Sequence, residues 1–405
     1  MRSALLLSGV SIWLLAIGAY LAPTEWIMGR NAIFLSLILL FLQFLKIRPD
    51  FTNMHKGWFF LVAITLCIGL SQYLWVMNYG DSTANWALAN INYTITYKYI
   101  ITFSVLIFLV NAIPNHVIEH CKKFILIGIG LSFSVAVIEA FHVYFTEDSP
   151  RANIGGISTT AAYLATLQGL LCLYTLVKIP VRYRSLLMLL VAVMTYIIII
   201  MTGTRSATLL FPFILFLIAC KTLRIKELKK FIPVFTVLLL IPLFFSNQIR
   251  ERFVEGYHDF NQDSTNNSTS IGSRFSMWES GIFTAKYHLI GQSAESRSHD
   301  ITHYIMANER GNPEALRNIP YHLHNEVIEI ASLQGVVPAL LMVLFYIVTI
   351  WLFKNKGKDN LPILTFTLPL VIFGGVDVLF IYPKVIVCIF SMLCIYNVLS
   401  RLEQP

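Results

Sequence analysis

Charged residues are scarce in this sequence. Only 13% of its 405 residues are Asp, Glu, Lys or Arg, whereas 56% are hydrophobic. A water-soluble domain carries about a quarter charged residues, so this composition excludes an ordinary soluble protein. The one long polar stretch, residues 247–324, contains no cysteine. That absence excludes a disulfide scaffold or a thiolate zinc site in this stretch.

Long apolar runs dominate the rest of the chain. Runs of about 20 apolar residues are long enough to cross a hydrocarbon layer roughly 30 Å thick, and they lack the alternation of a membrane β-barrel. We therefore predict an all-α polytopic membrane protein with about 12 transmembrane helices. The first run has no clear small-x-small cleavage pattern after it, so we expect it to be retained as a helix. The expected spans are 4–23, 32–46, 58–78, 97–113, 123–145, 157–177, 185–201, 205–220, 231–246, 325–353, 361–382 and 385–400.

The basic residues predict which side each connection faces. Lys and Arg concentrate on one set of connections, and both ends of the chain belong to that set. Because cytoplasmic loops are rich in these residues, both termini are expected in the cytoplasm, and the polar stretch on the external or periplasmic side. The same bias explains the net charge of +8 without nucleic acid as a partner. Outside the polar stretch, the outer side keeps Arg30, Lys98, Arg151, Arg205 and Lys384.

The polar stretch divides the chain into three predicted parts. These are helices one to nine in 1–246, a periplasmic loop or lid in 247–324, and helices ten to twelve in 325–405. Within the loop, 261–273 is rich in Asn, Ser and Thr and is expected to be mobile. An amphipathic helix is expected over 274–288, with Phe275, Trp278, Ile282 and Phe283 on one face, followed by short helices at 300–307 and 313–317. Such helices are able to lie on the membrane surface.

Two arginines are candidate phosphate ligands. Arg205 follows a tight Thr202-Gly203-Thr204 turn between two short spans, at a depth where a cation needs an anionic partner. Its guanidinium suits bidentate phosphate binding, although it could instead anchor the helix to phospholipid. Arg274 begins the amphipathic helix, and helix N-termini favour anions. A solvated loop arginine is the alternative for Arg274.

Histidines and buried acids are candidate catalytic groups. His324 lies just before an apolar run, where an imidazole can accept a proton from a hydroxyl near neutral pH. His322 competes for this role, and a structural interface histidine is the alternative for both. Asp377 and Glu139 lie inside predicted spans, so each is either a functional carboxylate or the partner of an arginine.

A second histidine pair suggests a metalloprotease. His299 and His303 are four residues apart, and Asp300 follows the first of them. This spacing imitates the zinc-protease helix, which has Glu at the position after the first histidine. Asp300 would be a shorter base, and no third ligand is evident in the sequence.

These residues together resemble the O-antigen ligases, a family of Gram-negative lipopolysaccharide-assembly enzymes. The resemblance covers nearly the whole chain, including one large loop between spans nine and ten. Arg205 and Leu209 match the family's Arg-x-x-x-Leu signature, and His324-Asn325 with Gly335 match its His-Asn…Gly pattern. Arg274 and Asp377 correspond in position to a second functional arginine and a late carboxylate. Pro338 departs from the pattern, which has Gly, Thr or Tyr there.

The resemblance implies a C-type glycosyltransferase (GT-C) fold in the bacterial inner membrane. The donor would be an O-antigen glycan on polyprenyl (undecaprenyl) pyrophosphate, and the acceptor a sugar hydroxyl of lipid A-core. Arg205 and Arg274 would bind the pyrophosphate, His324 would be the base of an inverting displacement, and Asp377 would support it. No Asp-rich metal motif faces the outer side, so we expect metal independence. An O-antigen polymerase of the same superfamily is the nearest alternative, and a transporter or a zinc protease is more distant.

Overall fold

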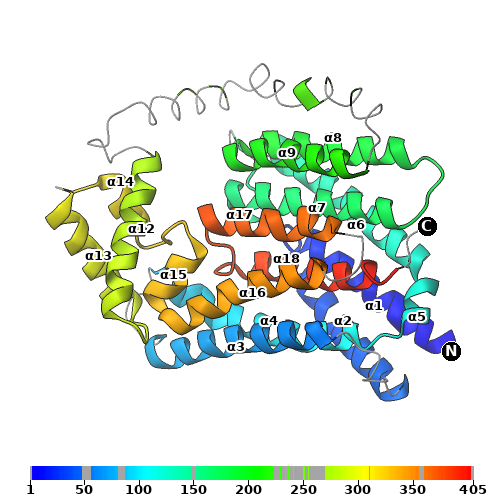
Figure 1. Cartoon of the computed structure of the whole chain (residues 1–405), viewed down its shortest axis with the longest axis horizontal. Coiled ribbons are helices and arrows are strands. Elements are labelled where there is room, and N and C mark those ends of the chain that lie inside the picture. Colours follow the sequence, from blue (N-terminus) through cyan, green and yellow to red (C-terminus); the bar gives the residue numbers. More distant parts are fainter. Residues whose placement is uncertain are drawn as a thin grey trace.

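The computed structural model is helical throughout the part of the chain that it describes (Figure 1). That part comprises residues 2–47, 56–80, 87–146, 151–222, 270–309, 311–354 and 360–402, with isolated positions between 229 and 254. The first group of helices is α1 (Arg2–Leu21), α2 (Trp26–Ile47), α3 (Lys56–Tyr79), α4 (Leu88–Asn111), α5 (Asn115–His120), α6 (Lys122–Thr146), η2 (Ile154–Gly156), α7 (Ser158–Lys178), α8 (Arg184–Thr202) and α9 (Arg205–Thr222). The second group is α12 (Ser270–Tyr287), α13 (Ala294–Asn308), α14 (Pro313–Asn318), α15 (Glu326–Leu333), α16 (Val336–Lys354), the π-helical turn η3 (Ile363–Thr367), α17 (Leu368–Val376) and α18 (Pro383–Leu399).

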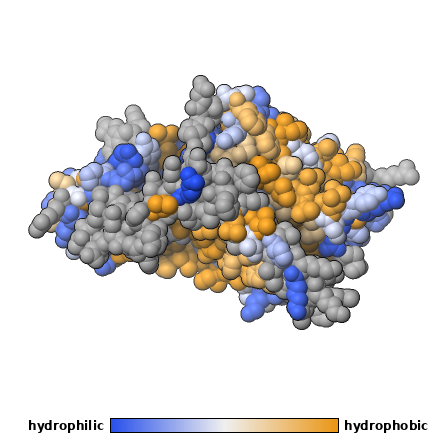
Figure 2. Space-filling view, turned by 90° about the horizontal axis from the view of Figure 1, so that it is seen from above, coloured by the Kyte–Doolittle hydropathy of each residue, from blue (hydrophilic) through white to orange (hydrophobic). Residues whose placement is uncertain are grey.

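The long helices have the length and composition of membrane spans. Eight of the described helices are long and apolar enough to cross a membrane, and three shorter apolar helices accompany them. Figure 2 shows hydrophobic side chains gathered around the middle of the long axis, with hydrophilic ones toward its ends. The protein is therefore a multi-pass helical membrane protein. Apart from isolated positions, the predicted span 231–246 lies outside the described residues, and so do residues 261–269 of the mobile stretch predicted at 261–273. The prediction is wrong for residues 270–273, which form the first turn of α12.

Two helices form the centre of the bundle. The α18 residues from Val385 to Leu399 are all buried, and α18 packs against α1, α4 and α7. Within α7, 94% of the apolar window is buried, so neither helix has a large surface left for lipid. Helices α12 to α14 lie at one end of the bundle, and α1 begins and α18 ends toward the other (Figure 1).

The helices α12 to α14, which we call the lid, form a small core of their own. Met277, Ile301, Ala315 and Leu323 are fully buried within it. Of the apolar residues predicted to share a face of α12, Phe275, Ile282 and Phe283 are exposed, whereas Trp278 is half-buried and donates to His324 O. Small and polar residues of α12 make the packed side, which lets its backbone approach α15 closely.

The predicted span 325–353 is wrong as a single helix. The structure breaks it into α15 and α16 at Gly335, whose φ is +98°. A Cβ there would lie 2.4 Å from the carbonyl oxygen of Leu289, so the lid backbone occupies the space that a side chain would need. Val336 N–H donates to that same carbonyl. Pro338 fits because it lies in the first turn of α16, where a helix leaves its N–H groups without partners.

The predicted span 361–382 ends early, which corrects the position of Asp377. Helix α17 stops at Val376, and Asp377 has extended backbone angles at its C-cap. The next residues turn away because the carboxylate of Glu326 accepts the N–H groups of Leu379 and Phe380. Asp377 is therefore not inside a span but in the loop between α17 and α18. The predicted 202–204 turn is confirmed, with Gly203 left-handed at φ 63°.

We predict that Gly335→Ala destabilises the protein. Alanine at φ +98° costs roughly 1–3 kcal/mol in backbone strain, and its Cβ would collide with the backbone of the lid. The melting temperature in detergent should fall by at least about 3 °C. Gly130→Ala is the matched control, because nothing lies within 4 Å of a Cβ at that helical position. Equal melting temperatures for the two variants would contradict this account of the close approach.

Candidate active site

The turn that carries His322 and His324 is held by a buried ion pair. Arg297 of α13 donates to Glu329 of α15 over 2.6 Å, and the two side chains are 2% and 0% exposed. The other Glu329 oxygen accepts the N–H of Leu323 at 2.8 Å. The residue between the two histidines is thus bound directly to the ion pair, which joins the lid to the bundle.

His324 has an unusual backbone conformation. Its φ is 51°, and it is the one non-glycine residue with positive φ among the described residues. Such a conformation is uncommon for a side-chain-bearing residue and is found preferentially at functional sites. Its carbonyl accepts the indole N–H of Trp278 at 3.2 Å. Asn325 follows as the N-cap of α15 and also donates to Gly375 O at 3.1 Å.

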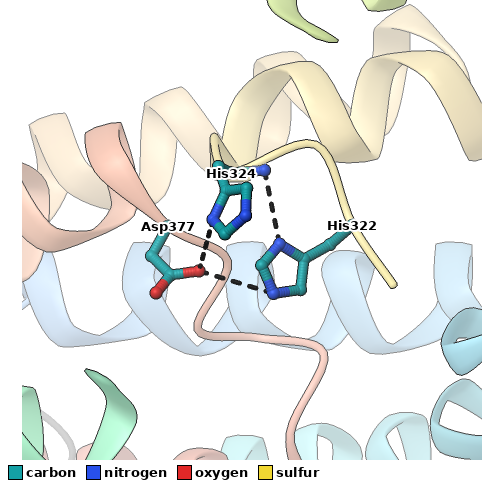
Figure 3. Close-up of side chains that lie close together, drawn as sticks. All are labelled: His322, His324 and Asp377. Carbon is teal, nitrogen blue, oxygen red and sulfur yellow. Dashed lines mark hydrogen bonds and ion pairs between the residues drawn. The ribbon is translucent and has the colours of Figure 1, made fainter. Parts of the chain in front are cut away.

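Asp377 lies between the two imidazoles (Figure 3). Its Oδ1 is 3.5 Å from Nε2 of His322 and 3.5 Å from Nδ1 of His324. The same oxygen accepts the N–H of Val378 at 2.9 Å. Burial by itself would raise the pKa of Asp377, but the contacts with the two imidazoles outweigh it and lower the pKa to about 2. Asp377 is therefore a fixed negative charge.

His322 is held neutral and in one tautomer. Its Nδ1 accepts the backbone N–H of His324 at 3.3 Å, so its proton is on Nε2, which faces Asp377. Burial lowers the pKa of His322 to about 4, although Asp377 opposes that shift. Both ring nitrogens are thus engaged. His324 is more accessible, with a side chain 22% exposed compared with 9% for His322.

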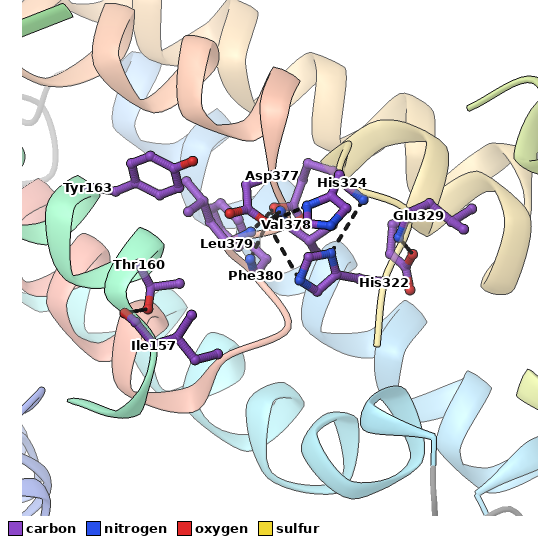
Figure 4. Close-up of polar contacts among 12 residues, drawn as sticks. Ile157, Thr160, Tyr163, His322, His324, Glu329, Asp377, Val378, Leu379 and Phe380 are labelled. Carbon is purple, nitrogen blue, oxygen red and sulfur yellow. Dashed lines mark hydrogen bonds and ion pairs between the residues drawn. The ribbon is translucent and has the colours of Figure 1, made fainter. Parts of the chain in front are cut away.

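The centre contains a tyrosine that the sequence did not single out. The hydroxyl of Tyr163, from α7, is directed toward Asp377 (Figure 4) and accepts from Ser206 at 3.4 Å. Tyr163 also interacts electrostatically with both Asp377 and Arg274. Its ring stacks on Phe373 with centroids 4.2 Å apart. A tyrosine within an apolar helix carries no signal by itself, because most such rings only pack.

The two candidate arginines approach this centre from different elements. Arg274 precedes Trp278 by one turn of α12, so both share a face, and Trp278 contacts His324. Arg205 begins α9 directly before Ser206, which contacts Tyr163. Arg151 donates to Thr202 O at 2.7 Å and so supports the turn before Arg205. Arg274, Asp377 and His324 thus surround one region, and Arg205 borders it through Ser206.

Three other candidates do not join this centre. Glu139 lies on α6 and takes part in none of the described interactions around Asp377. His299 is 81% exposed. Asp300 is paired with His288 at 3.0 Å, so it is not placed to act as a protease base.

His322, His324 and Asp377 are close enough to be tested as a metal site. One ligand atom from each lies within 4.8 Å of the others. However, a metal on Nε2 of His322 would require the proton on Nδ1, where it would point at the N–H of His324. The backbone donor at His322 therefore opposes a metal-binding tautomer, and these residues fit an acid–imidazole pair better than a metal centre.

The fold and the acid–histidine cluster together define the class of this protein. It is a multi-pass helical membrane protein with a buried acid–histidine cluster beneath a helical lid. Residues 186–344 match the family model described as O-Antigen ligase, a range that includes Arg205, Arg274 and His324. The chain is also 28% identical over 341 residues to a protein named O-antigen ligase from Escherichia coli (strain K12), which covers 82% of this chain and 80% of that protein. The resemblance to the O-antigen ligase family, within the wider ligase and polymerase group, is therefore confirmed.

We predict that Glu326→Gln flattens the pH dependence of stability. Burial raises the pKa of Glu326 to about 8, against the opposing hydrogen bonds from the Leu379 and Phe380 N–H groups. A carboxyl whose pKa is raised in the folded state is a source of stability below its unfolded pKa, and this stability is lost as pH rises through about 8. The glutamine amide oxygen can still accept both N–H groups without titrating.

Melting curves of both proteins between pH 5 and 9 measure this effect. Relative to Glu326→Gln, the melting temperature of the natural protein should fall by at least about 2 °C over that range. Glu314→Gln is the control, because Glu314 is a half-exposed carboxylate in a surface pair with Arg317. Parallel curves for Glu326→Gln and the natural protein would mean that Glu326 is already ionised at pH 5.

Proposed function

We propose that this protein is a glycosyltransferase that moves a glycan from polyprenyl pyrophosphate to a sugar hydroxyl of lipid A-core. The observation that carries the proposal is the Asp377–His324 pair beside Tyr163, with which Arg274 also interacts electrostatically. His324 and Arg274 lie in the range that matches the O-antigen ligase family model. A pyrophosphate ester needs no strong general acid to depart. It needs a base for the attacking hydroxyl and positive charge for the leaving oxygens.

His324 is the base in this proposal. Asp377 is ionised and faces Nδ1 of His324, so it favours the tautomer with the proton on Nδ1 and leaves Nε2 to accept a proton. The acceptor oxygen attacks the anomeric carbon as its proton passes to Nε2. The bond from that carbon to the phosphate oxygen breaks, and polyprenyl pyrophosphate departs with inversion. The proton then leaves His324 for the departing diphosphate or for water.

Arg205 and Arg274 are the proposed ligands of the diphosphate. Each presents a guanidinium suited to two phosphate oxygens. Arg205 adjoins Ser206, which contacts Tyr163, and Arg274 interacts electrostatically with Tyr163. Tyr163 adds a hydroxyl beside the same region. Because Arg274 belongs to the lid, binding of the diphosphate would also bring the lid and the bundle together.

The expected topology remains part of the proposal. It comprises a GT-C fold with spans in 1–246 and 325–405, a periplasmic lid in 247–324, cytoplasmic termini and an inner-membrane location. The shared end of α1 and α18, opposite the lid, supports this arrangement (Figure 1). Labelling of an added cysteine on the lid and another near the C-terminus in intact cells would test the orientation.

Reconstitution decides between the two functions of the family group. The purified protein is mixed with lipid-linked glycan and with lipopolysaccharide that lacks the glycan. A ligase yields glycan joined to lipid A-core, whereas a polymerase lengthens the lipid-linked glycan without needing the acceptor. Movement of lipid-linked glycan without a new bond would indicate a transporter instead.

We predict that alanine at Arg205, Arg274 or His324 nearly abolishes transfer. Loss of one group that stabilises developing charge costs about 10²–10³ in rate, and loss of a general base costs about 10²–10⁴. Initial rates of glycan joining should fall by at least about 100-fold in each variant, while melting temperatures stay close to that of the natural protein. Arg317→Ala, an exposed arginine of the lid, should keep its activity. A natural rate in His324→Ala would transfer the role of base to His322 or remove it.

We also predict that transfer does not depend on a divalent metal. The fixed tautomer of His322 opposes metal binding at the acid–histidine cluster, and the proposed arginines supply the positive charge for the leaving group. Initial rates after dialysis against EDTA should equal those before it. Activity that vanished with EDTA and returned with a divalent ion would refute this prediction.

A further inference from the structure

A cavity lined by three cations adjoins α7. It measures about 520 Å³ and is lined by residues of α2, α4, α7 and the start of α18. That volume is in the range of small-molecule pockets. Among the described residues that line it are three cations, Arg30, Lys98 and Lys384, and no acidic side chain.

The cations of this cavity come from distant parts of the chain. They are three of the five basic residues that the sequence assigns to the outer side outside the polar stretch. None of the three forms an ion pair with a carboxylate in the described part of the chain, although Lys384 donates to Pro23 O at 3.0 Å. Three unneutralised charges beside apolar helices repel one another and are costly in a membrane protein unless an anion joins them.

The rest of the cavity is apolar. Trp26, Phe34, Ile95 and Leu164 share its lining with the cations, on helices with the composition of membrane spans. An inorganic anion alone would leave these walls uncovered. A lipid with a phosphorylated headgroup satisfies both parts, because its phosphates meet the cations and its hydrocarbon or sugar carbons cover the apolar walls.

The cavity adjoins the acid–histidine cluster through one side chain. Tyr382 lines the cavity, and its ring lies edge-on to that of His322 with centroids 6.2 Å apart. On α7, Thr160 and Leu164 face the cavity while Tyr163 faces Asp377. Figure 4 shows Thr160 and Tyr163 on the same helix beside the cluster. A lipid in the cavity would therefore have its headgroup next to the proposed base.

We propose that this cavity binds the phosphate groups of the acceptor, a phosphorylated glycolipid. The inference rests on the proposed function, in which Arg205 and Arg274 already hold the phosphates of the donor. A reaction between two lipid-anchored substrates needs a second headgroup site on the same face of the membrane. Among the described residues, this cavity combines the charge, the apolar walls and the contact with the acid–histidine cluster, through Tyr382 and His322, that this second lipid requires.

Acceptor binding is tested without any transfer reaction. Native mass spectrometry of the full-length protein in detergent measures the affinity for lipid A-core, for the same glycolipid after removal of its phosphates, for polyprenyl pyrophosphate and for phosphatidylglycerol. The variants are Arg30→Gln, Lys98→Gln and Lys384→Gln, singly and combined, with Arg30→Lys and Lys98→Arg as conservative partners. Lys286→Gln is the control, because Lys286 is an exposed lid cation outside the cavity.

The expected result is a selective loss. The combined variant should bind intact lipid A-core at least about tenfold more weakly, with smaller losses in the single variants and near-natural binding in the conservative ones. Binding of the dephosphorylated glycolipid and of polyprenyl pyrophosphate should not change. Because Lys384 supports Pro23, the Arg30 and Lys98 variants carry the test if Lys384→Gln fails to fold.

Three outcomes would overturn the inference. These are unchanged affinity for lipid A-core in all variants, an equal loss for phosphatidylglycerol, or a loss for polyprenyl pyrophosphate instead. In the transfer assay, the variants should raise KM for the acceptor and leave KM for the donor unchanged. If the natural protein transfers nothing but the selective loss of binding is seen, the proposed function fails while the glycolipid site stands.

Discussion

The buried pair of Arg297 and Glu329 is the interaction on which the site depends. It lies where the lid meets the bundle, and its members are almost completely hidden from solvent. Removal of one member of such a pair typically costs about 3–5 kcal/mol, because the other charge is left buried without compensation. Glu329 also binds Leu323 N–H, and Arg297 also binds Ile319 O at 3.3 Å. The same buried ion pair therefore holds the lid against the bundle and fixes the backbone of the turn that carries His322 and His324.

Two interrupted helices bring the reactive groups together. The break at Gly335 lets the lid backbone cross the bundle, and the end of α17 at Val376 releases Asp377 from a helical position. Glu326 connects the two interrupted regions. It is the first residue of α15, and its side chain accepts the N–H groups of Leu379 and Phe380, just after Asp377. In continuous helices, the directions of the His324 and Asp377 side chains would have been set by their positions around each helix axis. The loop between α17 and α18 instead aims the carboxylate directly at both imidazoles.

Arg151 and the three cations of the cavity have different surroundings. A positive charge near the hydrocarbon layer is stable only with an anion, with water or with backbone carbonyls. Arg151 binds the turn before Arg205, whereas Arg30, Lys98 and Lys384 line the cavity that adjoins α7. Tyr163 and Tyr382 lie between these groups and the acid–histidine cluster. In the proposed reaction, Arg205 and Arg274 would bind the phosphates of the donor, and the three cations of the cavity would bind those of the acceptor.

Much of the architecture could be predicted because apolar length and helix period are local properties. The ranges of α1, α3 and α6 to α9, the 202–204 turn and the family resemblance all follow from residues read in order. Gly335 and Asp377 were recognised as candidates, but their helix breaks were not, since each break is stabilised by a partner far away in the chain.

What only the tertiary structure decided concerns contacts between distant segments. The sequence does not specify which nitrogen of a histidine carries the proton. In the folded protein, the backbone N–H of His324 determines this for His322, and the Asp377 carboxylate determines it for His324. Tyr163 gained a role only through its position beside Asp377. The cationic cavity required α2, α4, α7 and α18 to converge. Hydrophobic patterning therefore determines where the chain crosses the membrane, whereas charge and hydrogen bonding act over a few ångströms and depend on which crossings become neighbours.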